Sequence, residues 1–175
     1  TPSPLYATGL QELGKWLTYE ALRDWLPHRS EDIETGISQT TGTVIESSVP
    51  LVSIPINSAG FHIWLGARDV LPNSELFLKV LPDVIEKNTG LLIFIGQISY
   101  GDDLINILEE LNKKEVEAKR IRVITAIACS KGLTEIGKIA PDLNIYCACI
   151  DPDLSNNGQI IPGIGNPSLK LNTII

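Results

Sequence analysis

Short apolar runs alternate with amphipathic segments along most of this chain. Apolar residues spaced three and four positions apart predict helices, and near-continuous apolar stretches predict buried strands. The predicted strands cover residues 51–56, 76–80, 91–95, 121–128 and 143–150, and the predicted helices between them cover 59–71, about 103–114 and 132–140. Strands that are apolar on both faces and alternate with helices are typical of a parallel sheet covered on both sides. The pattern therefore predicts an α/β fold.

The first and last parts of the chain follow different patterns. Residues 10–26 place apolar side chains at helical spacing, and Pro27 ends this predicted helix. Residues 30–48 are mostly polar with weak alternation, which predicts a loop with one or two edge strands. The tail, about 151–175, is rich in Gly, Pro and Asn, yet residues 160–165 are too apolar for a free linker. We expect this tail to fold back over the sheet edge as a hood.

Composition narrows the class of protein. A length of 175 residues favours one domain, 1–175, with a core large enough to fold without disulfides or a structural metal. The apolar runs are far shorter than the roughly 20 residues of a membrane-spanning helix, so no integral membrane span is expected. A net charge of −7 without a basic stripe makes nucleic acid a poor partner. Three cysteines without secretory spacing favour a reducing compartment.

Candidate chemistry is sparse. In parallel sheets ligands bind at the carboxyl ends of the strands, so the informative loops are those after the predicted strands. Cys147 and Cys149 share one face of a strand, with Cys129 near the end of its neighbour. A three-thiol metal site is one interpretation, but buried structural thiols are favoured. His62 lies near the top of the sheet, and a role as general base is the weaker of its interpretations because no acid or thiol is spaced for it.

Three stretches resemble uracil phosphoribosyltransferase. They are Leu13–Ala21, Ile54–Gly60, and Tyr146–Asp151 followed by Asn157–Gly165. The similarity runs in order over nearly the whole chain and is greatest to cyanobacterial and plastid-type members. It implies a type I phosphoribosyltransferase-like parallel sheet with helices on both faces and a C-terminal hood. In that family main-chain groups of the hood bind uracil, which places a candidate base-binding segment at Ile160, Ile161 and Gly163.

The family transfers a phosphoribosyl group from 5-phosphoribosyl diphosphate to N1 of uracil, and one of its loops cradles ribose and phosphate. Carried over, this vestigial loop comprises Ile95, Gly96, Ser99, Tyr100, Gly101, Asp102 and Asp103. Isoleucine replaces the carboxylate that holds the ribose, tyrosine takes a threonine position, and the two aspartates repel phosphate. The favoured interpretation of the aspartates is an N-cap and first-turn acid of the next helix. A cation site is the alternative.

Three further family features are altered. The arginine that contacts pyrophosphate is Ser58 here, preceded by Asn57, so this vestigial contact carries no charge. A mobile arm expected between Leu76 and Leu91 is missing. The acidic end of the family's hood reads Gly165 to Leu169 without a carboxylate.

These departures predict a non-catalytic uracil phosphoribosyltransferase homologue that acts as a subunit or scaffold in a protein assembly. One alternative is a sensor that binds uracil or a similar small molecule. The other is an active uracil phosphoribosyltransferase that makes UMP. We expect no catalytic residue, no cofactor and no metal.

The expected partner is another protein. The predicted helix 10–26 carries Trp16, Tyr19 and Trp25, more aromatic surface than one buried face needs, and such residues are enriched at interfaces. The missing arm is expected to weaken a homodimer. Since the chain contains no Met, Thr1 is not a translation start. We therefore expect a cytoplasmic protein, or a plastid stromal one if a targeting peptide was removed.

Overall fold

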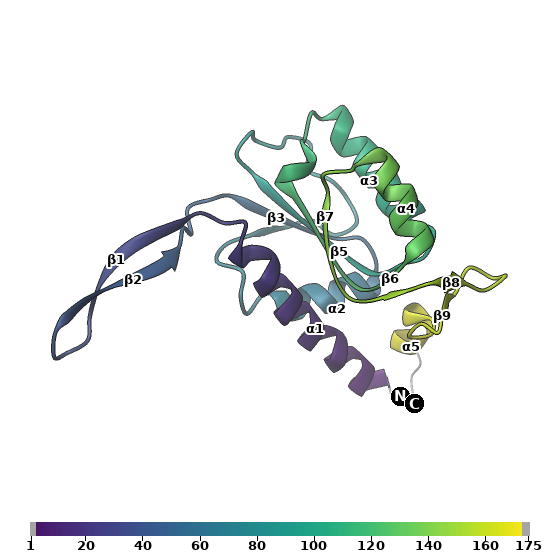
Figure 1. Ribbon diagram of the computed structural model, residues 1–175, viewed down its shortest axis with the longest axis horizontal. Coiled ribbons are helices and arrows are strands. Elements are labelled where there is room, and N and C mark those ends of the chain that lie inside the picture. Colours follow the sequence, from purple (N-terminus) through teal and green to yellow (C-terminus); the bar gives the residue numbers. More distant parts are fainter. Residues whose placement is uncertain (1–2, 173–175) are drawn as a thin grey trace.

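The computed structural model describes residues 3–172 of the chain (Figure 1). The helices are α1 (Ser3–Arg23), α2 (Ser58–Ala67), α3 (Asp102–Lys113), α4 (Ser130–Ile139) and α5 (Pro167–Asn172), with a 3-10 turn at Ala118–Arg120. The strands are β1 (His28–Glu34), β2 (Gln39–Ile45), β3 (Leu51–Pro55), β4 (Glu75–Leu76), β5 (Gly90–Ile98), β6 (Ile121–Cys129), β7 (Asn144–Asp151), β8 (Asp153–Leu154) and β9 (Ile160–Ile161). No helix among these residues is long and apolar enough to cross a membrane.

The central sheet has five parallel strands in the order β4-β3-β5-β6-β7. The predicted α/β architecture is confirmed. From β3 the chain passes to β4 on one side, whereas β5 lies on the other side of β3. The strand order therefore reverses beside β3. In open α/β sheets such a reversal leaves a crevice at the carboxyl ends of the two strands that flank it, here β3 and β5.

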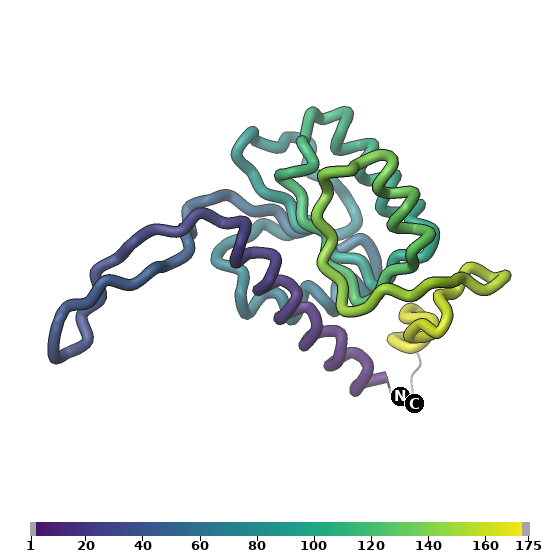
Figure 2. Tube along the Cα trace, viewed as in Figure 1, coloured from purple at the N-terminus to yellow at the C-terminus, as the bar shows by residue number. Residues whose placement is uncertain are grey.

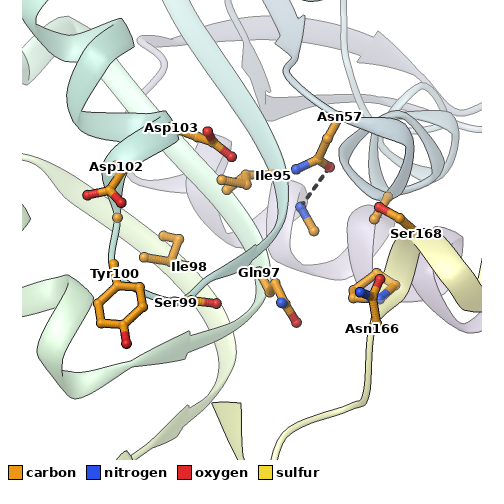
Figure 3. Close-up of a pocket in the computed structure, with 14 residues that line it drawn as sticks. Asn57, Ile95, Gln97, Ile98, Ser99, Tyr100, Asp102, Asp103, Asn166 and Ser168 are labelled. Atoms are coloured by element: carbon orange, nitrogen blue, oxygen red, sulfur yellow. Dashed lines mark hydrogen bonds between the residues drawn. The ribbon is translucent and has the colours of Figure 1, made fainter. Parts of the chain in front are cut away.

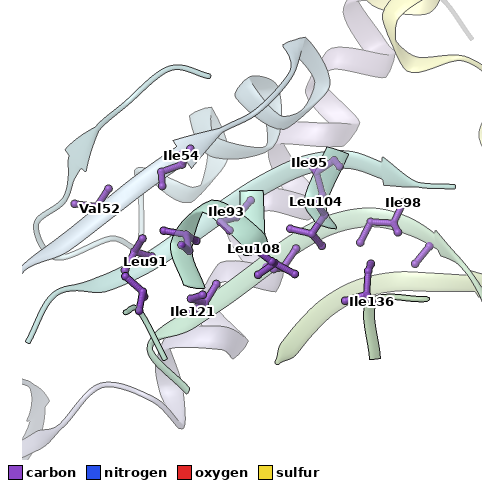
Figure 4. Close-up of a cluster of buried hydrophobic side chains, with 14 residues drawn as sticks. Val52, Ile54, Leu91, Ile93, Ile95, Ile98, Leu104, Leu108, Ile121 and Ile136 are labelled. Carbon is purple, nitrogen blue, oxygen red and sulfur yellow. The ribbon is translucent and has the colours of Figure 1, made fainter. Parts of the chain in front are cut away.

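Helices cover both faces of the sheet, because the central strands are apolar on both sides. One buried cluster joins side chains such as Ile93 and Ile54 to Leu104 and Leu108 of α3 and Ile136 of α4 (Figure 4). The other cluster packs the opposite sheet face, including Leu92 and Phe94, against α1 and α2. Full burial of each such side chain contributes about 1.5–3 kcal/mol. The two clusters, one on each face of the sheet, form most of the core.

Glycines allow α1 and α2 to cross closely. A Cβ at Gly66 of α2 would overlap the carbonyl oxygen of Gln11 in α1, and one at Gly14 of α1 would overlap the carbonyl oxygen of Ile63 in α2. The two backbones therefore touch where most helices are held apart by side chains.

The N-terminal helix differs from its prediction at both ends. It begins at Ser3 rather than residue 10, with Pro4 in the first turn, where proline is tolerated. It ends at Arg23 rather than residue 26. The amides of Trp25 and Leu26 both donate to the carbonyl of Leu22 and form a turn, because the residue before a proline disfavours the helical conformation.

Strands are present within residues 30–48 as predicted, but they do not form an edge of the central sheet. β1 and β2 pair antiparallel as a separate two-stranded hairpin that projects from the body of the molecule (Figures 1 and 2). Every residue of β1 is exposed, and the side chain of Ile37 in the connecting turn is 98% exposed. This segment has no continuous apolar face, so it gains nothing by joining the buried sheet.

The predicted strand 76–80 is shorter than expected. The amides of Phe77 and Lys79 still bond to carbonyls of β3, but Lys79 adopts a φ of 60°, which ends the regular strand β4 after Leu76. Helix α2 also ends four residues before the predicted 71.

The hood is present as β8, β9 and α5. Ile160 anchors it by packing with Ile127 and Cys129 of β6. Residues 1–2 of the predicted domain and 173–175 of the predicted hood lie outside the described part of the chain.

Candidate functional site

A cavity of about 310 Å³ lies at the carboxyl ends of β3 and β5 (Figure 3). Its lining comes from the turn after β3, the end of β5 with the loop into α3, and the start of α5 in the hood. The lining residues are Asn57, Ala59, Ile95, Gly96, Gln97, Ile98, Ser99, Tyr100, Gly101, Asp102, Asp103, Asn166, Pro167 and Ser168. The cavity therefore occupies the crevice that the strand order creates, and all residues of the predicted vestigial loop line it.

Asn57 fixes one wall of the cavity. Its side-chain Oδ1 accepts hydrogen bonds from the amide of Gly60, at 2.8 Å, and from the amide of Gly96, at 3.3 Å. The first bond caps α2, and the second ties that cap to β5. Ser58 is the first residue of α2 and is not part of the cavity lining. Ser58 stands where the family resemblance implies an arginine that contacts pyrophosphate. This position therefore brings neither a charge nor a side chain into the cavity.

Close packing holds this wall in place. A Cβ at Gly60 would overlap the carbonyl oxygen of Phe94, and one at Gly96 would overlap the methyl group of Ala59. The N-terminal turn of α2 thus rests directly on the backbone of β5.

Ile95 belongs to the hydrophobic core. It is 2% exposed and packs in the cluster that contains Leu104 of α3. Its side chain offers no acceptor to a ribose hydroxyl. This end of β5 therefore forms part of the cavity wall but cannot hydrogen-bond a sugar through the side chain of Ile95.

Tyr100 lies at the margin of the cavity. Its ring is half exposed, and a Cβ at Gly158 would approach the ring to 2.9 Å, so the ring packs against the turn between β8 and β9. Figure 3 shows it on the far side of the cavity from Asn57 and Asn166. Tyr100 therefore contacts the hood from the rim of the cavity.

Asp102 and Asp103 are the first two residues of α3. The N-cap is Gly101, with a φ of 95°, and no side chain caps this helix. The predicted N-cap role is therefore wrong, while the predicted role as first-turn acids is confirmed. Carboxylates in a first turn stabilise a helix by about 0.3–1 kcal/mol each. They also make the cavity acidic, because its lining contains these two carboxylates and no Lys, Arg or His.

Asp151 organises the hood. The amide of Gly163 donates to its Oδ2 at 2.7 Å, and the thiol of Cys149 donates to its Oδ1 at 3.4 Å. Asp151 is 7% exposed, so this carboxylate is a buried bridge between β7 and the turn after β9. Sequence reasoning missed this role, although the residue lies within a stretch that carries the family resemblance.

The candidate base-binding residues do not line the cavity. Ile160 is buried, Ile161 is 47% exposed, and Gly163 has a φ of 66° that favours glycine. Because the Gly163 amide already donates to Asp151, it is engaged within the protein rather than free to bind a base.

The three cysteines do not converge. Cys129 is buried, Cys147 is half-buried and Cys149 is exposed. Burial raises the pKa of the Cys147 thiol, and the hydrogen bond to Asp151 raises the pKa of Cys149. Among residues 3–172, no three His, Cys, Asp or Glu side chains are grouped to hold a metal ion.

His62 does not line the cavity. It is half-buried on α2, beside Phe61 with the ring centroids 6.5 Å apart, and its Nδ1 is buried with no hydrogen-bond partner. Burial lowers the pKa of this imidazole, because desolvation disfavours its charged form. This position outside the cavity lining gives no support to a role as general base.

We expect His62 to make folding sensitive to mild acid. The unfolded chain takes up a proton here near pH 6.5, and the folded chain does so only at lower pH. The free energy of unfolding therefore falls as pH falls through this window. In urea titrations, His62→Phe should show a weaker loss of stability between about pH 7 and pH 5 than the wild type. Parallel pH profiles for the two proteins would contradict this assignment.

The overall architecture has a counterpart among solved protein structures. A solved protein structure from Aquifex aeolicus superposes with a TM-score of 0.81, covering 99% of this chain and 88% of that one at 24% identity, which supports the fold alone.

Sequence comparison identifies the family. Residues 73–168 match the family model for uracil phosphoribosyltransferase. The uracil phosphoribosyltransferase of Synechococcus elongatus is 32% identical, covering 98% of this chain and 86% of the relative. The uracil phosphoribosyltransferase of Synechocystis is 31% identical, covering 95% of this chain and 84% of the relative. The chloroplastic uracil phosphoribosyltransferase of Arabidopsis thaliana is 29% identical, covering 95% of this chain and 62% of the relative. The chain belongs to the uracil phosphoribosyltransferase family.

Proposed function

We propose that this chain is a non-catalytic member of the family that acts as a subunit or scaffold in a protein assembly. The observation that carries the proposal is the charge of the cavity. Its lining holds Asp102 and Asp103 and no basic side chain. A site for 5-phosphoribosyl diphosphate must bind several phosphate charges, which basic side chains and free amides normally stabilise. An acidic lining opposes that binding.

The other departures act on different parts of the reaction. Ile95 provides no group for the ribose, and Ser58 lies outside the lining, so the leaving pyrophosphate finds no guanidinium there. Asn166 and Ser168 reach the cavity from the hood without a carboxylate. Ribose binding, phosphate binding and leaving-group stabilisation are weakened together, which supports loss of turnover.

The outer face of α1 supports a role in assembly. Trp16 is 61% exposed, Tyr19 is 45% exposed and Leu5 is 64% exposed. Trp25, by contrast, is half-buried beneath the guanidinium of Arg122, at 4.7 Å from the ring centre. Trp16 and Tyr19 of α1 thus point outward, although Trp and Tyr are side chains that gain most from contact with a partner.

Isolation of the native assembly tests this proposal. The tagged full chain, recovered from its own cells under mild conditions, is expected in a stoichiometric complex larger than the free chain. Trp16→Glu should reduce recovery of the partner at least about tenfold, as expected for an interface hot spot. Val84→Glu is the matched control, because Val84 is 81% exposed on a different segment. Recovery of the free chain alone, or equal recovery with Trp16→Glu, would contradict the proposal.

One observation favours the sensor alternative. The side-chain Oε1 of Gln97, in the cavity lining, is buried and has no hydrogen-bond partner. A small molecule with a donor group would satisfy it. Saturable binding of uracil at micromolar concentration in ligand-observed NMR, lost in Gln97→Leu, would favour a sensor over a scaffold.

A further inference from the structure

β7 is an open edge of the central sheet. It runs for eight residues and pairs with β6 along one side only. In the part of the chain that the structure describes, no strand pairs with its other side. Backbone N–H and C=O groups of alternate residues are therefore presented outward along its length.

This edge lacks the features that usually prevent pairing. Natural edge strands are short, or carry lysine, proline or a bulge. The opposite edge of this sheet, β4, has only two residues. In β7 the seven residues from Asn144 to Ile150 include no charge and no proline, and the register with β6 continues without a shift. Ala148 and Cys149 are exposed, and Ile150 is 55% exposed.

The sequence of β7 is nearly symmetric about Ala148. Cys147 and Cys149 flank it, with Tyr146 and Ile150 outside them. When two copies of such a strand meet antiparallel around a two-fold axis, like residues face like residues. Ala148 then faces Ala148, each Cys147 faces Cys149, and each Tyr146 faces Ile150. Aromatic residues opposite β-branched residues are favourable cross-strand pairs.

We propose that the occupant of this edge is a second copy of the chain, with β7 paired antiparallel to β7 about an axis at Ala148. The near-symmetric sequence supports a second copy, and charge limits where that copy can bind. Each chain has a net charge of −7, so copies repel one another over most approaches. The neutral stretch of β7 lets two backbones come together without opposing carboxylates, because Asp151 at its end is buried and bonded to Gly163. The two five-stranded sheets become one continuous sheet.

Charge substitution at the axis tests the proposal. Analytical ultracentrifugation from about 1 µM to about 1 mM covers the usual range of weak and moderate dimers. The wild type is expected to form a dimer, and both Ala148→Lys and Ala148→Glu are expected to be monomeric, since each places like charges opposite one another. An equimolar mixture of the two variants should restore the dimer.

The control is Ile139→Lys, which introduces the same charge at a residue of α4 that is 47% exposed. It should dimerise like the wild type. A monomeric wild type, a mixture that stays monomeric, or equal loss of dimer in Ile139→Lys would each overturn the proposal. Circular dichroism of the Ala148 variants checks that the fold is retained. Misfolded chains could not restore the dimer in the mixture, so its restoration is a second control for folding.

Crosslinking gives a second readout. Diamide takes two electrons and two protons from a pair of thiols as their disulfide forms, and at about pH 9 the thiolate fraction is raised. Cys147 and Cys149 of one chain are about 6.6 Å apart along the strand, at the limit of disulfide reach, so the facing pair between chains should react first. The crosslinked dimer should be lost in Cys149→Ser and kept in Cys129→Ala. A crosslink that persists in Cys149→Ser would contradict the register.

Discussion

Uracil and 5-phosphoribosyl diphosphate, incubated with this protein and magnesium, are expected to yield no measurable UMP. Phosphoribosyl transfer depends on positioning the two reactants and stabilising the charge that builds on pyrophosphate. The cavity has an acidic lining, and Ile95 is buried where the family resemblance implies a carboxylate. Losing several such interactions at once removes many orders of magnitude in rate, since about 1.4 kcal/mol is already tenfold.

The control is the uracil phosphoribosyltransferase of Synechococcus elongatus, which is 32% identical and is assayed in parallel. Formation of labelled UMP is followed over hours at high protein concentration. Turnover within a hundredfold of ordinary enzymes, which work at about 1–1000 per second, would refute the non-catalytic proposal and favour an active enzyme.

Gly66→Ala is expected to destabilise the fold by about 3 kcal/mol, the upper end for overpacking, because the added methyl group meets rigid backbone. That group would overlap the carbonyl oxygen of Gln11 where α1 crosses α2, and neither helix can move without disturbing the core. For a chain of this length the melting temperature should fall by roughly 6–12 °C.

Gly137→Ala is the matched control for this experiment. Gly137 lies in α4, is exposed, and a Cβ there would have no atom within 4 Å. The same substitution should stabilise this helix by roughly 0.5–1 kcal/mol, since alanine is the better helix former. Equal effects of the two substitutions on stability would show that the close approach of α1 and α2 does not exclude a methyl group at position 66.

The sequence predicts the sheet well because the central strands are apolar on both faces. It misses the last residues of β5, since Gly96 and Gln97 interrupt the apolar run although their backbone continues the ladder with β6. The sequence indicates strands within residues 30–48 but misses their pairing into a separate hairpin, because the residues of β1 and β2 alternate too weakly.

The place of the cavity follows from strand order, but its internal bonding does not. The loops after β3 and β5 meet wherever such a sheet reverses its order, so Asn57 and the residues after Ile95 are found from sequence. The bond between Asp151 and Gly163 joins residues twelve apart through the turns of the hood. No local spacing rule indicates that pair, and only the folded backbone brings it together.

Burial of Ile95 also determines how the fold would tolerate a carboxylate at this position. Where the family resemblance implies a carboxylate, a side chain that is 2% exposed now packs with Leu104. Burying an isoleucine contributes about 1.5–3 kcal/mol, whereas an unpaired carboxylate at the same depth would be strongly unfavourable. Because the neighbouring side chains pack against isoleucine, an acid at this position would lower stability before it restored any binding. The packing around Ile95 therefore opposes a carboxylate at this position.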